Sequence, residues 1–351
     1  MTQNTANSTP SRLPHWPATL LVCAVFPLIW VGGLVTSSDA GMAVPDWPST
    51  YGYNLFLYPW KTWFFGPWDI FVEHGHRLFG ALVGLLTIVL CWSLRKNQAP
   101  AWLQRLAWFS LGFVIFQGVL GGMRVVLGKQ MLAMVHGCVG PLFFALSVAL
   151  WHYTARNVAS ATPSAQEGGA KLFRLSLVTT VLAYLQLVLG AVVRHTPHMP
   201  ESASPGLFRI AVLLHLFMAA VLTIHVVLVF ARGCRTSVAG ELPSVRRPAS
   251  LLLVAILVQL TLGAGTWVVN YGIPDWAQTA LVGEYVVRTQ SFTQLLVTTA
   301  HVAVGSLILA TSLVVTLRAK LFCGSSVGVR RVQASSAALL MSGFMLRGAT
   351  A

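Results

Sequence analysis

Residues 71–80 read FVEHGHRLFG, and they place one carboxylate, two imidazoles and a guanidinium where a long apolar run begins. Side chains four residues apart lie on the same face of a helix, so His76 and Gly80 are predicted to face the same way. This His-x-x-x-small pattern recurs at the start of three further apolar runs, as His136 with Gly140, His215 with Ala219, and His301 with Gly305. Each run is therefore predicted to be a helix that carries one histidine beside a small residue, all at a similar depth.

The composition indicates a polytopic membrane protein. Of the 351 residues, 56% are hydrophobic and 9% are charged, whereas a soluble domain carries about 25% charged residues. A hydrocarbon core of about 30 Å requires about 20 apolar residues of helix. Eight runs meet this length, near residues 18–36, 75–94, 106–127, 131–151, 172–193, 210–231, 249–269 and 295–317. They predict eight transmembrane helices.

An internal repeat divides these helices into two halves, separated by a Ser-, Ala- and Gly-rich segment. Three odd-numbered runs share a Gln-x-x-x-Gly motif, at Gln117–Gly121, Gln186–Gly190 and Gln259–Gly263; the first run carries Ile29 and Gly33 there. The predicted fold class is an all-α integral membrane protein whose eight helices form two pseudo-symmetric four-helix bundles. The predicted segments are a cytoplasmic tail (1–15), an N-terminal bundle (16–155), a cytoplasmic linker (156–170), a C-terminal bundle (171–320) and a cytoplasmic tail (321–351).

The lysine and arginine residues predict the orientation. When the runs alternate across the membrane, 16 of the 23 basic residues fall on the side of the amino terminus and seven on the other side. The positive-inside rule then places both termini in the cytoplasm, as expected for a multi-pass protein of the cell inner membrane. Nearly all of the net charge of +14 lies on that face, where anionic lipid headgroups are the expected partner. No nucleic-acid partner is expected.

The four repeated histidines are candidate ligands of heme iron. A lone histidine in a membrane helix is more often a packed, hydrogen-bonded residue, but four at one depth favour a functional role, because a polar side chain in hydrocarbon is costly. Imidazole is an axial ligand of heme, and helix bundles build cofactor sites from facing helices. Zinc or copper would favour clustered ligands with Cys, Met or carboxylate company. The pattern thus predicts two hemes, one held by His76 and His136 and one by His215 and His301.

Glu73 distinguishes the first half from the second. It precedes His76 by three residues on the same helical face, and the corresponding positions before the other ligands hold Ala133, Val212 and Thr298. A carboxylate beside the iron-bound ring would take or relay protons during an oxidation; the alternative is a structural ion pair with Arg77. His74 points to another face of the helix and is not expected to bind iron.

Three arginines lie at the same level. Arg77 is a candidate partner of a heme propionate or of Glu73, while Arg124 and Arg194 either pair with propionates or extend to the membrane interface. The glutamines of the odd runs either serve the site or join helices, and their glycines permit close packing. Four further histidines are predicted to be interfacial or solvated: His152, His195, His198 and His225.

These motifs resemble the heme A synthase (COX15/CtaA) family. The resemblance rests on eight runs, on EHGHR at residues 73–77, on the single histidines of the later even runs, and on the loop GMAVPDWPSTYG at 41–52. It implies oxidation of the C8 methyl group of heme O to a formyl group, giving heme A for cytochrome oxidase. It also implies that His215 and His301 hold heme b, that His76 and His136 hold the substrate heme, and that Glu73 is catalytic.

The resemblance further implies the lipid bilayer, a heme O synthase and an unidentified electron acceptor as partners, and it leaves the oligomeric state open. One branch of the family carries a cysteine pair in outer loops, which this chain lacks. Two other functions use the same helices. A di-heme b-type cytochrome would share the four histidines but leave Glu73 unexplained, and a transporter or assembly scaffold built on repeated hairpins would bind no heme.

Overall fold

A computed structural model describes residues 13–159, 163, 167–196, 205–236, 244–273 and 286–323. The expectations for most of the two tails and for His198 lie outside the described residues. Eight helices are long and apolar enough to cross a membrane, which confirms the predicted fold class. They are α1 (Trp16–Ser37), α3 (Trp68–Lys96), α4 (Ala101–Leu127), α5 (Gln130–Thr154), α7 (Gly169–His195), α8 (Pro205–Thr236), α9 (Arg246–Tyr271) and α11 (Phe292–Leu321).

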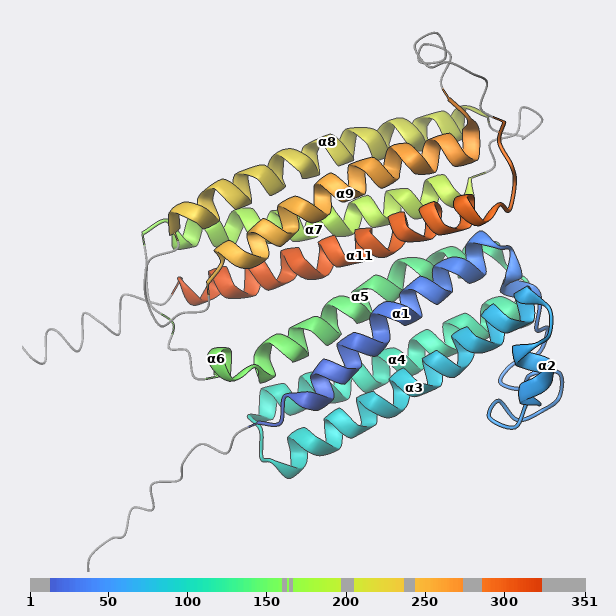
Figure 1. Cartoon of the computed structure of the whole chain (residues 1–351). Coiled ribbons are helices and arrows are strands. Elements are labelled where there is room, and N and C mark those ends of the chain that lie inside the picture. Colours follow the sequence, from blue (N-terminus) through green and yellow to red (C-terminus); the bar gives the residue numbers. More distant parts are fainter. Residues whose placement is uncertain are drawn as a thin grey trace, which may run out of the picture.

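The helices form two groups of four that lie side by side (Figure 1). In the first group α1 packs on α3, α3 on α4, α4 on α5, and α5 back on α1. The second group repeats this circle with α7, α8, α9 and α11. Between the groups, α1 contacts α11, α5 contacts α7, and α5 contacts α11. This order is consistent with pseudo-symmetry, because exchanging the halves turns the first of these contacts into the second.

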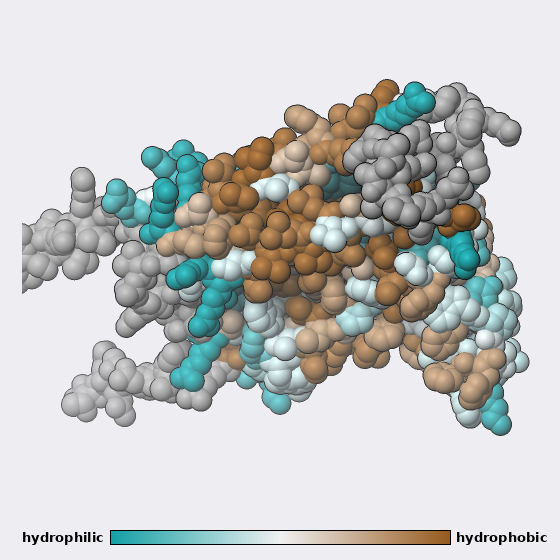
Figure 2. Space-filling model, turned by 45° about the horizontal axis from the view of Figure 1, so that its top comes forward, coloured by the Kyte–Doolittle hydropathy of each residue, from teal (hydrophilic) through white to brown (hydrophobic). Residues whose placement is uncertain are grey.

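Each helix extends beyond the apolar run that predicted it. Helix α3 starts at Trp68, directly after Pro67, and carries Asp69 in its first turn, where a negative charge interacts favourably with the helix dipole. Hydropathy detects only the portion within hydrocarbon, so it misses this turn. Figure 2 shows the hydrophobic belt across the helices, with hydrophilic residues toward the ends. As a result, Glu73 lies within α3, in the second turn, and not before its first residue.

The close-packed core lies in the half of the membrane nearer the amino terminus. The largest fully buried side chains of the first bundle include Leu21, Leu94 and Phe144, and those of the second include Leu172 and Leu252. All of them lie far along the helices from the repeated histidines. The outer half of both bundles is therefore free to hold a cavity.

The segment between α1 and α3 folds over the outer end of the first bundle. It contains a short 3-10 helix, η1 (Ala40–Met42), and a short helix, α2 (Trp60–Phe64). His74 anchors this segment: its Nδ1 lies 3.0 Å from the Thr50 hydroxyl, and its ring packs against Tyr58 and Trp63. Its side chain is buried in these contacts, in agreement with the prediction that it faces away from the other histidines.

Candidate functional site

The four repeated histidines form two pairs. The ring centres of His76 on α3 and His136 on α5 lie 6.4 Å apart. In the other half, the rings of His215 on α8 and His301 on α11 are separated by the same 6.4 Å. The structure therefore pairs the histidines within each half, as the repeat predicted.

Each histidine ring packs against a glycine of the membrane helix that precedes its own in the chain, namely α1, α4, α7 or α9. A Cβ added at that glycine would stand 2.9 to 3.2 Å from the ring Cε1 atom, closer than ordinary contact, so only glycine leaves the ring in place. The contacts pair His76 with Gly32, His136 with Gly121, His215 with Gly190, and His301 with Gly263.

This arrangement corrects the predicted register of the first helix. Gly32 contacts the His76 ring, whereas Gly33 faces Thr299 of α11. The residue equivalent to the repeated glutamines is therefore Leu28, not Ile29. The sequence offered two adjacent glycines with no glutamine to choose between them, and only the packing of His76 decides.

The pairs have the geometry that an axially ligated heme requires. A metal–imidazole bond of about 2.0–2.1 Å, with about 1.1 Å from the nitrogen to the ring centre, puts two axial rings about 6.3 Å apart. The Nδ1 atoms of His76, His136 and His301 are buried without a hydrogen-bond partner. Both pairs line one continuous cavity of about 1690 Å³, which has room beside each pair. The residues thus fit two hemes.

The glutamines of α4, α7 and α9 differ in their contacts with the histidine rings. The side-chain nitrogen of Gln186 lies 3.2 Å from both ring nitrogens of His215, and that of Gln259 lies 3.4 Å from Nε2 of His301. Gln117 is buried and neither of its side-chain polar atoms has a partner. Among these glutamines, only the two in the second half therefore contact a histidine ring through their side chains.

Glu73 is buried on the wall of the same cavity. Its Oε2 accepts a hydrogen bond of 2.9 Å from the Val44 amide, and its Oε1 lies 2.9 Å from Nη2 of Arg77. Both oxygens are thus oriented by neighbours. Because a carboxylate has about four acceptor sites, Glu73 can still accept a hydrogen bond from a molecule in the cavity.

Arg77 joins Glu73 to the loop above it. Besides Glu73, its guanidinium donates to the main-chain carbonyls of Val44, Asp46 and Ser49. The ion pair with Arg77, which the sequence left as the alternative role of Glu73, therefore exists as part of a larger network. Arg77 lines the cavity, but most of its donors are already in use.

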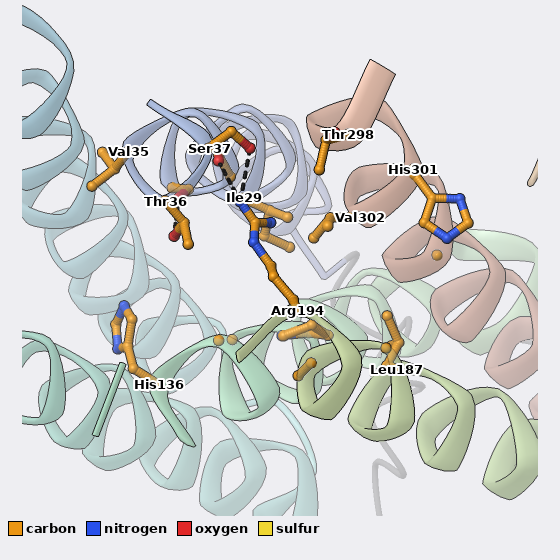
Figure 3. Close-up of a pocket in the computed structure, with 18 of the residues that line it drawn as sticks. Ile29, Val35, Thr36, Ser37, His136, Leu187, Arg194, Thr298, His301 and Val302 are labelled. Carbon is orange, nitrogen blue, oxygen red and sulfur yellow. Dashed lines mark hydrogen bonds between the residues drawn. The ribbon is translucent and has the colours of Figure 1, made fainter. Parts of the chain in front are cut away.

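The other two arginines also reach the loop and helix ends from the cavity wall. Arg124 donates to the carbonyl of Gly41. Arg194 extends from α7 across to α1, where it donates to Ser37 Oγ at 2.7 Å. Figure 3 shows Arg194 between His136 and His301, which lie on opposite sides of it. Arg194 thus stands between the two histidine pairs.

Several known proteins are similar to this chain in sequence. Residues 67–204 match the family model COX15-CtaA, described as cytochrome oxidase assembly protein. A heme A synthase of Shouchella clausii is 28% identical over 64% of this chain and 77% of its own length. Those of Symbiobacterium thermophilum (34%; 48% and 54%) and Geobacillus thermodenitrificans (26%; 72% and 81%) are also similar. Over the matched residues the chain is similar to proteins of the heme A synthase family.

The family match covers only part of the cavity. It includes Glu73, the first histidine pair and all three candidate arginines, whereas His215 and His301 lie beyond its end. The second histidine pair is therefore a candidate site only because its ring separation and its glycine contacts are equivalent to those of the first pair.

Two groups of residues differ from the sequence-based picture. His152, predicted to be interfacial or solvated, has only 1% of its surface exposed, because α1 and α11 cover the end of α5. Trp47 and Pro48 of the outer loop line the cavity, and a Cβ at Gly122 would overlap the Trp47 ring. The loop motif PDWP was the available signal, but its spacing alone did not show that it closes the site.

Proposed function

We propose that this protein is a heme A synthase, which oxidises the C8 methyl group of heme O to a formyl group. Two relatives whose match with this chain covers most of their own length carry that name. Conversion of a methyl to a formyl group removes four electrons and replaces two hydrogens by one oxygen. With water as the oxygen donor, such a reaction releases four protons and four electrons. It therefore needs a proton acceptor beside the substrate and an electron acceptor, which is an unidentified partner.

The observation that carries this proposal is the asymmetry at Glu73. This carboxylate lines the cavity one turn from His76, and no ionisable group stands at the equivalent positions Ala133, Val212 and Thr298. A pure electron carrier has no need of a carboxylate there. Held by Val44 and Arg77, Glu73 is oriented before a substrate arrives, which favours general base catalysis.

In this proposal the two halves have different tasks. His76 and His136 hold heme O as substrate, and His215 and His301 hold a heme b cofactor, which supplies one-electron chemistry. The contacts of Gln186 and Gln259 with the second pair would orient those rings. Arg124 and Arg194, on the cavity wall, are the candidate partners of propionate groups, and Arg77 contributes what its remaining donors allow.

The apolar surroundings of the cavity suit a substrate with a long isoprenoid tail. Such a molecule would enter from the bilayer, where a heme O synthase would release it. We place both termini in the cytoplasm and the protein in the cell inner membrane, on the distribution of 16 basic residues against seven. Reporter fusions at each end of the chain test this orientation.

The test uses co-expression with a heme O synthase, followed by extraction and chromatography of the hemes. The wild type should yield heme A. Glu73→Gln keeps the size and the hydrogen bond from Val44 but removes the base, so it should retain bound heme in the spectrum and lose most heme A. Thr50→Val is the matched control, because it loosens the same loop without touching the cavity. Normal heme A from Glu73→Gln would contradict the proposal.

The equal ring separation in the two halves also favours a second function, a di-heme b-type cytochrome for electron transfer. That protein would contain protoheme alone. Finding heme O or its oxidised products in the purified wild type excludes it.

A further inference from the structure

A second cavity lies at the opposite end of the helices, where the two halves meet. Its volume is about 580 Å³. It is built by the residue before α1, the end of α5, the short helix α6 (Arg156–Ala159) and the end of α11. The lining residues are His15, Trp151, His152, Ala155, Arg156, Val158 and Arg318.

Two side chains of this cavity, His152 and Arg318, carry buried polar atoms without a partner. His152 is 1% exposed, and neither of its ring nitrogens has a hydrogen-bond partner. Arg318 donates from Nη1 to the Ser244 carbonyl at 2.7 Å, but its Nε is buried without a partner. Buried polar groups are nearly always hydrogen-bonded. Unsatisfied groups on one cavity wall therefore indicate a ligand that supplies the missing contacts.

The charge of the wall identifies the class of ligand. Two guanidinium groups and two imidazoles line the cavity, and none of its described lining residues carries a carboxylate. A metal cation is disfavoured beside two arginines, whereas phosphate is the anion whose geometry a guanidinium matches best. The small apolar side chains Ala155 and Val158 and the ring of Trp151 border the same space, and tryptophan is typical of the membrane interface.

We propose that this cavity binds a phosphate group, supplied by the headgroup of an anionic phospholipid. Basic pockets between helices at this level of a membrane are suited to such headgroups. His152 and Arg318 make the central contacts, and His15, fixed by a 2.9 Å contact with the Thr154 hydroxyl, closes one side. Arg318 belongs to the second half, and Trp151, His152 and Ala155 belong to the first. The bound lipid therefore stabilises the contact between the halves, and free phosphate is the alternative source of the same group.

Thermal unfolding of the full-length protein in detergent tests this proposal. Dioleoylphosphatidylglycerol should raise the Tm of the wild type, because a ligand that binds only the folded state stabilises it; dioleoylphosphatidylcholine should not. Arg318→Gln should weaken the response about tenfold in lipid concentration. Lys320→Gln is the matched control: it removes the same charge two residues further along, at an exposed position outside the cavity, and should keep the full response.

The remaining outcomes are also decisive. If inorganic phosphate raises the Tm and phosphatidylglycerol adds nothing, the site is supported and its ligand is the soluble anion. Equal losses in Arg318→Gln and Lys320→Gln, or no response of the wild type to lipid or phosphate, would overturn the proposal. His152→Leu guards against a folding defect in Arg318→Gln: it removes the unsatisfied imidazole, so it should unfold no earlier than the wild type while native mass spectrometry shows less retained phosphatidylglycerol.

Discussion

Replacing Gly121 by alanine provides a strict test of the histidine geometry. The new Cβ would stand 3.0 Å from Cε1 of His136, and ordinary contact begins at 3.4 Å. The ring must therefore retreat by about 0.4 Å, twice the roughly 0.2 Å tolerance of metal–ligand bonds. Alanine also favours helix over glycine by about 1 kcal/mol, so the variant should fold.

The expected result is loss of the heme of the first half while the heme of the second half remains. The measurements are heme content per chain and the reduced-minus-oxidised spectrum of the purified protein. Gly112→Ala is the matched control on the same helix, because a Cβ there meets nothing within 4 Å. Gly190→Ala should give the mirror result, with loss of the heme held by His215, because a Cβ there would stand 3.1 Å from Cε1 of that ring.

Equal heme content and identical spectra in Gly121→Ala and Gly112→Ala would refute the reasoning. That outcome would mean either that His136 does not bind iron or that α4 and α5 separate without cost. A loss of both hemes in Gly121→Ala, with a normal elution profile, would contradict the independence of the two halves.

Two further predictions concern the outer loop. Arg77→Met removes the donor to Glu73 and to three main-chain carbonyls, and breaking a buried ion pair costs about 3–5 kcal/mol. The Tm of this variant should therefore fall, whereas the control Lys61→Met, at an exposed position, should leave the Tm unchanged. Burial opposes ionisation of Asp46, but main-chain hydrogen bonds from Gly52 and Tyr51 lower its pKa below the ordinary 3.8. Because the folded pKa is depressed, the stabilisation holds above 3.8 and disappears as the pH falls through the folded value. Proteolysis of the loop should rise in that acidic range, and Asp46→Asn should abolish the pH dependence; an unchanged profile would contradict it.

The site was partly predictable because its repeat is local. His76 and its three counterparts each carry a small residue one helical turn away, and this spacing can be read from the chain without knowing which helices touch. The glycine that supports each ring lies on a different helix. Where Gln-x-x-x-Gly marked it, as at Gly121, the motif was visible but its purpose was not. In α1, where Gly32 and Gly33 are adjacent, the prediction chose the wrong one.

The position of the outer loop could not be predicted for the same reason. A Glu73–Arg77 pair could be named as an alternative from the sequence, since four residues along a helix bring the two side chains together. Their partners in the loop, Val44, Asp46 and Ser49, are separated from them by a long segment, and hydrogen bonds to main-chain atoms leave no trace in side-chain identity. The buried position of His152 likewise depends on α1 and α11, which cover it from other parts of the chain.

Eight membrane helices, the four histidines at one depth and the unique carboxylate at Glu73 followed from the sequence by itself, because hydropathy and helical spacing are local properties. Only the tertiary structure decided that the histidines meet in pairs 6.4 Å apart, that Gly32 supports the first ring, and that one cavity serves both halves. These features depend on contacts between helices, which are set by the close packing of side chains distant in the chain.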